Sequence, residues 1–231
     1  MSAHGETGNG HGPDLPVAGG PMQTDVPAFR LIATLAIAGA LAGLLIVSVF
    51  QWAQPRILAH QALVLGQAIE EVLSDPARYD TLYVAGDALT KQPPAGTDPA
   101  SLDKVYLGFD DDGAPVGFAV QWAEPGFQDV ITLLFGYDAA NNRLLGMTVM
   151  EAKETPGLGD KIIKDTAFVN GFSGPTTPIV GVKVGAGTGA PEEVDMITGA
   201  TISSRAVIKI INDRLEQIGP LLRAYHPGGG S

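Results

Sequence analysis

One stretch decides how this chain folds, and it runs Asp195-Met196-Ile197-Thr198-Gly199-Ala200-Thr201-Ile202-Ser203-Ser204-Arg205. Downstream of it, apolar residues recur every three or four positions until Gly219-Pro220. These residues are Val207, Ile208, Ile210, Ile211, Leu215 and Ile218. Such spacing predicts an amphipathic helix that begins within the quoted stretch and ends at Gly219-Pro220.

The start of this predicted helix is rich in hydroxyl groups and poor in bulk. Gly199 and Ala200 would let a ligand approach the backbone closely. The free N–H groups and the positive end of the helix dipole favour an anion there. From the residues alone two interpretations stay open, a phosphate site and an ordinary N-cap, because Ser and Thr are common caps. The hydroxyls in question belong to Thr198, Thr201, Ser203 and Ser204.

The quoted stretch resembles the flavin-attachment motif of the RnfG/NqrC family. In that family a Ser/Thr-Gly-Ala-Thr sequence ends in a threonine esterified to the phosphate of FMN, and the matching residue here is Thr201. A second family motif, Glu-Thr-Pro-Gly-Leu-Gly, is intact from Glu154 to Gly159. Two motifs in the right order make the resemblance specific, and it extends from about Phe29 to Leu222.

The resemblance implies a set of FMN-binding residues. Thr201 would be the covalent anchor, and the Glu154 to Gly159 loop would pack against the isoalloxazine ring. Lys183 matches a family lysine that contacts the cofactor, although it also fits a plain surface position, and Arg205 has the same two interpretations. No residue is predicted as catalytic or as a metal ligand. The other cofactor contacts would be Thr198, Gly199, Ala200, Ser203, Ser204, Glu154, Thr155, Gly157, Leu158 and Gly159.

Composition limits the classes of function. The net charge of −11 argues against nucleic acid as a partner and against adhesion to anionic lipid. It also disfavours non-covalent binding of a phosphate, because like charges repel. A covalent bond to the phosphate group, or positive groups close to it, would overcome this repulsion. The chain has no cysteine, which excludes a Cys-ligated iron–sulfur cluster, a thiolate nucleophile and covalent c-type haem.

The N-terminal part predicts a tail and a membrane anchor. Residues 1–28 carry no Lys or Arg and are rich in small residues, which is typical of disorder. Leu31 to Phe50 has no charged residue, and twenty residues at ~1.5 Å each span the ~30 Å of a bilayer core. We therefore expect a transmembrane helix over 29–52, with a cleaved signal peptide as the alternative. Arg30 and Arg56 flank both ends, so charge does not give the orientation.

The remaining residues, 53–231, predict an α+β domain with an antiparallel-rich sheet and packed helices. Pro55 should break the first helix, and Ile57 to Leu73 should form a second one. Two hairpins are expected, over 105–122 and 130–150, and one further strand over 179–184. Asp110-Asp111-Asp112 fits the first turn better than a calcium site, since other ligands of an EF-hand are missing. We assign no cofactor role to the turn at 123–127.

The resemblance implies an electron-transfer subunit with covalent FMN in a membrane-bound Rnf-type oxidoreductase complex coupled to ion translocation. It would be a redox subunit that is not catalytic alone. It would sit in the bacterial cytoplasmic membrane with its large domain on the periplasmic side. Its partners would be the other membrane subunits, the lipid bilayer and a flavin transferase. Two alternatives stay open: an NqrC-like or other extracytoplasmic flavin carrier, and a non-redox membrane-anchored binding or assembly module.

Overall fold

The computed structural model describes residues 27–227, so the predicted tail lies almost entirely outside the described residues. The first element is a long helix, α1 (Ala28–Leu73). It continues through Pro55, so the predicted break there is wrong. A proline removes one backbone hydrogen bond of a helix, and the continuous helix shows that the residues on both sides offset that loss.

The chain divides into two units between Arg56 and Ile57. In the first unit, α1 exposes its apolar side chains, including Leu41, Leu44 and Phe50. Within the described residues, α1 is the one helix that is long and apolar enough to cross a membrane. An apolar surface of this kind is stable when lipid surrounds it.

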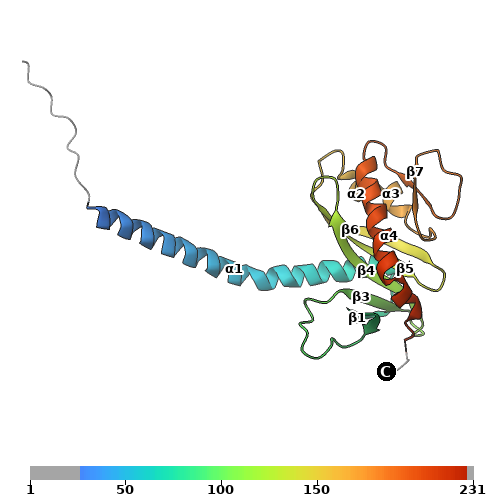
Figure 1. Cartoon of the computed structure of the whole chain (residues 1–231), viewed down its shortest axis with the longest axis horizontal. Coiled ribbons are helices and arrows are strands. Elements are labelled where there is room, and N and C mark those ends of the chain that lie inside the picture. The colour runs from blue at the N-terminus through green and yellow to red at the C-terminus, as the bar shows by residue number, and fades with distance from the viewer. Residues whose placement is uncertain (1–26, 228–231) are drawn as a thin grey trace, which may run out of the picture. The chain divides into compact units, whose positions relative to one another are not determined.

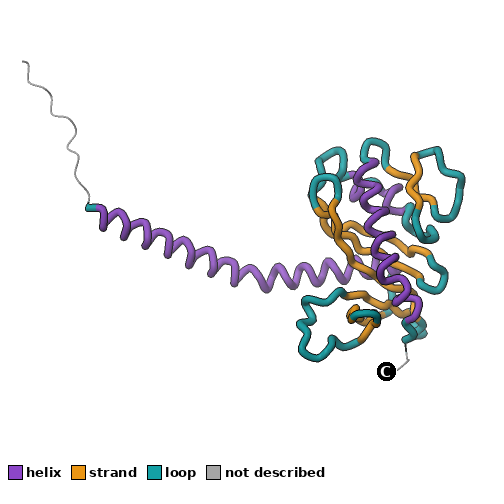
Figure 2. Tube along the Cα trace, in the orientation of Figure 1, coloured by secondary structure: helices purple, strands orange, loops and turns teal. Residues whose placement is uncertain are grey.

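The second unit contains a six-stranded antiparallel sheet (Figure 2). Both predicted hairpins are confirmed, since β3 pairs with β4 and β5 pairs with β6. Two strands before them, β1 and β2, were not predicted. The spatial order is β2-β1-β3-β4-β5-β6. The bounds are β1 (Arg78–Ala85), β2 (Ala88–Thr90), β3 (Lys104–Phe109), β4 (Pro115–Pro125), β5 (Val130–Asp138) and β6 (Arg143–Ala152).

Helices cover both faces of this sheet. The last helix, α4 (Thr201–Ala224), lies across one face, as Figure 1 shows, and buries Val207, Ile211 and Leu222 in the main core. On the other face the last turns of α1 pack Ile69 and Val72 against the strands. The predicted end of α4 at Gly219-Pro220 is wrong, because the helix continues to bury Leu222.

The connection from β6 to α4 holds two short helices and a second, smaller sheet. The helices are α2 (Lys161–Lys164) and α3 (Thr166–Asn170). The strands β7 (Val180–Lys183) and β8 (Glu193–Met196) pair in parallel, with Lys183 opposite Met196. The predicted strand at 179–184 is confirmed, whereas β8 was not foreseen. Together these elements confirm the α+β class, and β8 delivers the chain directly to the start of α4.

Candidate functional site

The turn between β8 and α4 leaves the start of the helix open. Gly199 has φ +83°, the left-handed region that favours glycine, and Ala200 precedes the first helical residue, Thr201. No side chain caps α4 within the described residues, so the interpretation of the hydroxyls as an ordinary N-cap is wrong. The N–H groups of the first turn are therefore available to an anion.

The four hydroxyls of this turn differ in what they contact. The Ser204 hydroxyl accepts a hydrogen bond from Ile197 N (3.1 Å) and donates one to the Ala200 carbonyl (3.0 Å), which closes the turn. The Ser203 hydroxyl donates to Glu154 Oε2 (3.0 Å). Both serines are buried, whereas Thr198 is exposed and Thr201 is half-buried. Thr198 and Thr201 are thus the two hydroxyl residues of the turn that remain at least partly exposed.

Glu154 connects the loop after β6 to two other segments. Its side chain is buried, and its Oε1 accepts hydrogen bonds from Phe127 N (3.0 Å) and Gln128 N (3.2 Å). The next residue, Thr155, donates from its hydroxyl to Gln128 Oε1 (2.7 Å). The turn after β4, to which the sequence assigned no cofactor role, is therefore fastened to the predicted flavin loop and borders the site.

Glycines make room for this arrangement. A Cβ on Gly159 would lie 2.5 Å from Glu154 Oε2 and 2.9 Å from the Ser203 hydroxyl. A Cβ on Gly126 would lie 2.5 Å from Glu154 Oε1. Gly157 has φ +78° and open space around it. The glycines at 126 and 159 thus let backbone approach the carboxylate from two sides, and Gly157 shapes the tip of the loop.

A positive charge beside the turn was missed by sequence reasoning. Lys161 Nζ lies 3.9 Å from the position that a Cβ on Gly199 would occupy. Lys161 opens α2 two residues after the Glu154 to Gly159 motif, and that adjacency was the available signal. Lys183 is exposed at the end of β7, and Arg205 is exposed on α4. Nearby, a hydrogen bond from the Lys164 ammonium lowers the pKa of Asp160 below its usual value.

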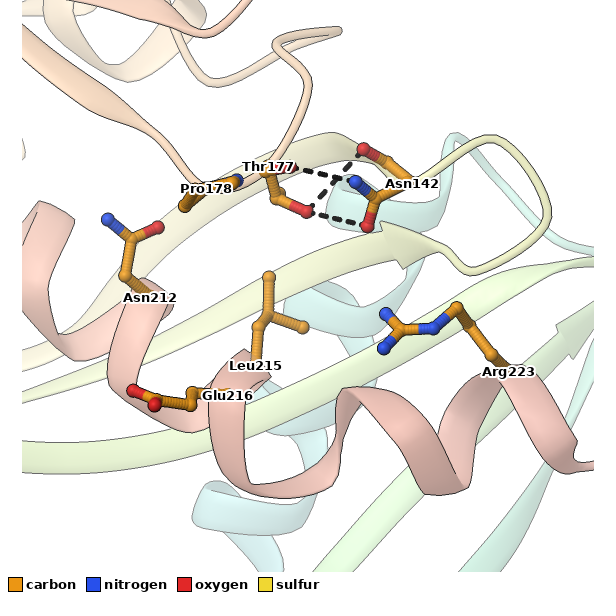
Figure 3. Close-up of a pocket in the computed structure, with 7 residues that line it drawn as sticks. All are labelled: Asn142, Thr177, Pro178, Asn212, Leu215, Glu216 and Arg223. Carbon is orange, nitrogen blue, oxygen red and sulfur yellow. Dashed lines mark hydrogen bonds between the residues drawn. The ribbon is translucent and has the colours of Figure 1, made fainter.

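A pocket of about 520 Å³ lies beside the turn, between β8 and the two short helices, and is within the size range of ligand sites. Lys161, Phe168, Val184, Asp195 and Thr198 are among the residues that line it. A second pocket, of about 600 Å³, lies along the middle and end of α4 and contains none of the predicted site residues (Figure 3). In it Thr177 donates a hydrogen bond to the Asn142 side chain (2.9 Å).

The residues present fit a phosphate-bearing, ring-containing cofactor such as FMN. The uncapped helix start, the clear space at Gly199 and the Lys161 ammonium suit a phosphate. Each of the three connected segments also exposes one large apolar side chain that could lie against a ring. These are Phe127 (61% exposed), Leu158 (53%) and Ile202 (58%).

Comparison with known proteins agrees with this geometry. Residues 126–216 match the family model described as FMN-binding domain. Over 182 residues the chain is 32% identical to the G subunit of the ion-translocating oxidoreductase complex of Pseudomonas aeruginosa, covering 74% of this chain and 79% of the relative. The corresponding G subunit from Yersinia pestis is 34% identical over 68% of this chain and 74% of its own. That of Methanosarcina acetivorans is 29% identical over 82% and 93%.

Two solved structures share the fold. NqrC of Shewanella oneidensis superposes with a TM-score of 0.54 at 18% identity, covering 68% of this chain and 88% of its own. The C subunit of the Na⁺-translocating NADH-quinone reductase from Parabacteroides distasonis gives a TM-score of 0.52 at 23% identity, over 63% and 78%. At these identities the structures support the fold alone.

Proposed function

The chain belongs to the family of G subunits (RnfG) of ion-translocating oxidoreductase complexes, and we propose that it carries FMN esterified through its phosphate to Thr201. It is a flavin electron-transfer subunit of such a complex, and α1 anchors it to the membrane. Bound FMN would supply redox chemistry that side chains lack. The expectation that this chain is closer to RnfG than to NqrC is confirmed by the curated relatives.

The state of the hydroxyls supports Thr201 as the attachment residue. Ser203 and Ser204 are buried and hydrogen-bonded to protein atoms, so neither presents a free hydroxyl. Thr198 and Thr201 remain, and Thr201 stands at the position of the esterified threonine in the motif. It is also the first residue of α4, where the uncapped N–H groups can bind the phosphate.

The surrounding residues would bind and orient the cofactor. Gly199 gives the phosphate access to the backbone, and Lys161 offsets its charge in an otherwise acidic chain. Thr155, Gly157 and Leu158 form the tip of the loop proposed to lie against the ring. Lys183 remains a second candidate cation, since it adjoins Val184 at the edge of the pocket.

The topology and the maturation partner are also proposals. We place residues 53–231 on the periplasmic side of the bacterial cytoplasmic membrane, where a flavin transferase would attach FMN. The anchor would then be 29–52, the exposed apolar part of α1. The other proteins of the complex would be its electron donor and acceptor.

In-gel fluorescence tests the attachment. Wild type, Thr201→Ala and Thr198→Ala would be produced in the native host, with its flavin transferase, and denatured in SDS. We expect denaturation-resistant flavin fluorescence in wild type and Thr198→Ala, and none in Thr201→Ala. The Thr198 variant controls for a general disturbance of the turn. Wild type without covalent flavin, despite an active transferase, would contradict the proposal and leave an anchored binding or assembly module as the better account.

A further inference from the structure

We infer that Glu154 is a positioning residue, which holds three separate segments of the flavin site together through its carboxylate and does not itself contact the flavin. The segments are the turn at 126–129, the loop at 154–159 and the first turn of α4. Their role toward FMN rests on the function proposed above. The connection itself is a property of the protein without its cofactor.

Both oxygens of the carboxylate accept hydrogen bonds from protein groups. Oε1 accepts from the backbone N–H groups of Phe127 and Gln128, and Oε2 accepts from the Ser203 hydroxyl. Glu154 is only 7% exposed. Gly126 and Gly159 lie so close to the two oxygens that neither position has room for even a methyl group. A cofactor atom would therefore have to displace protein donors in order to reach Glu154.

The connection joins parts of the chain that are distant in sequence. Phe127 and Glu154 are 27 residues apart, and Glu154 and Ser203 are 49 residues apart. Ser203 lies two residues after Thr201 on the same helical turn. Glu154 therefore helps to fix the positions of Phe127 and Leu158 relative to Thr201. Loss of the carboxylate should loosen the 126–129 turn, because the N–H groups of Phe127 and Gln128 would lose hydrogen bonds to a charged acceptor.

Substitution by glutamine separates position from charge. The carbonyl of the introduced amide can accept from both backbone N–H groups, while its NH₂ group can donate to the Ser203 oxygen, since a hydroxyl both donates and accepts. Glu154→Gln should therefore preserve the three hydrogen bonds of the carboxylate, whereas Glu154→Ala should remove them and leave the Thr155–Gln128 hydrogen bond as the remaining side-chain link between the two loops. If Glu154 instead acted on the flavin through its negative charge, Glu154→Gln would disturb the flavin as strongly as Glu154→Ala.

Hydrogen exchange of the full-length protein in detergent tests the connection directly. All variants would carry Thr201→Ala, so that no flavin covers the turn, and fragmentation would resolve single amides. Glu154→Ala should exchange the amides of Phe127 and Gln128 roughly tenfold faster or more, as expected for loss of hydrogen bonds to a charged group. Glu154→Gln should stay near the parent rate. Glu151→Ala, at an exposed position three residues earlier, is the matched control.

The flavin-loaded protein provides the second measurement. With Thr201 intact, Glu154→Gln should keep the flavin midpoint potential and visible circular dichroism of wild type, whereas Glu154→Ala should shift both. Ser203→Ala, which removes one of the three bonds, should shift them less and keeps the test decisive if Glu154→Ala does not fold. The inference would be overturned if the amides of Phe127 and Gln128 exchanged at the parent rate in Glu154→Ala. It would also be overturned if Ser203→Ala left the flavin properties unchanged while Glu154→Gln shifted them fully. Absence of covalent flavin in wild type would refute the proposed attachment without affecting the exchange result.

Discussion

Alanine at Gly159 should destabilise the domain by crowding the Glu154 carboxylate. The added Cβ would lie 2.5 Å from Glu154 Oε2, 2.8 Å from Glu154 Cβ and 2.9 Å from the Ser203 hydroxyl. All three distances are shorter than ordinary van der Waals contact, and Glu154 Cβ is attached to backbone and cannot rotate away. Overpacking of this kind costs about 1–3 kcal/mol of unfolding free energy.

Thermal unfolding of the full-length protein in detergent would measure this cost. For a domain of this size each kcal/mol lowers Tm by roughly 2–4 °C, so a cost of about 2 kcal/mol predicts a fall of about 4–8 °C. The matched control is Gly66→Ala, where the nearest atom is Tyr79 Oη at 3.7 Å and the backbone is helical. Alanine there should leave Tm unchanged or raise it slightly, because alanine favours a helix over glycine.

A double-mutant cycle identifies the source of the effect. In the Glu154→Ala background the clash with Oε2 is gone, so Gly159→Ala should cost less than it does in wild type. An unchanged Tm for Gly159→Ala would refute the reasoning, because the packing around the carboxylate would then be looser than these distances require. An equal cost in both backgrounds would show that the clash involves groups other than the carboxylate.

Three further outcomes follow from the structure. Lys161→Gln should slow covalent flavin loading more than Lys183→Gln does, because Lys161 lies beside Gly199. In-gel fluorescence over time would measure the loading rate, and the reverse order of the two variants would favour Lys183 as the phosphate partner. Hydrogen bonding by the Thr188 hydroxyl lowers the pKa of Glu193 from its usual 4.5. The stabilisation that ionised Glu193 gives to the folded state is therefore complete above pH 4.5 and is lost as the pH falls through the lowered pKa. The Tm difference between wild type and Glu193→Gln should therefore be larger at pH 7 than at pH 3, and a constant difference would contradict this assignment. Arg214→Ala should lower the unfolding free energy by about 2–3 kcal/mol in a denaturant titration, because the buried guanidinium lies over the indole of Trp122 and pairs with the carboxylate of Asp103. An unaltered unfolding midpoint would show that neither contact contributes to stability.

Local sequence patterns predicted the elements whose signals lie close together in the chain. The helix after Thr201 shows a clear 3–4-residue period, and both hairpins have alternating strands around a short turn, so all three were found. β8 was missed because it has four residues and is stabilised by parallel pairing with β7 across a Gly-rich segment. β1 was missed because, of its residues, only Leu82 is buried, so its pattern is weak.

The two prolines show where local rules fail. Pro55 and Pro220 both lie inside helices, although each predicted a helix end. In α4 the reason is tertiary, since Leu222 beyond the proline is buried in the core and holds the last turn in place. Proline propensity describes the cost to the isolated helix, and packing outweighs it here.

The site was predicted as motifs and not as contacts. Both motifs were expected to contribute to one site, and the structure joins them through Glu154 and Ser203. The third segment, with Phe127, was not predicted because its bonds to Glu154 cross 27 residues with no periodic signal. Lys161 was overlooked because its proximity to Gly199 exists only after folding.

Mass spectrometry of one peptide tests the central claim most directly. Trypsin cleaves after Lys183 and Arg205, and no Lys or Arg lies between them, so Thr201 falls within the peptide 184–205. On protein matured in its host, this peptide should carry the mass of one FMN less one water, and fragmentation should place it on Thr201. An unmodified peptide, or a flavin placed on Thr188 or Thr198, would contradict the account.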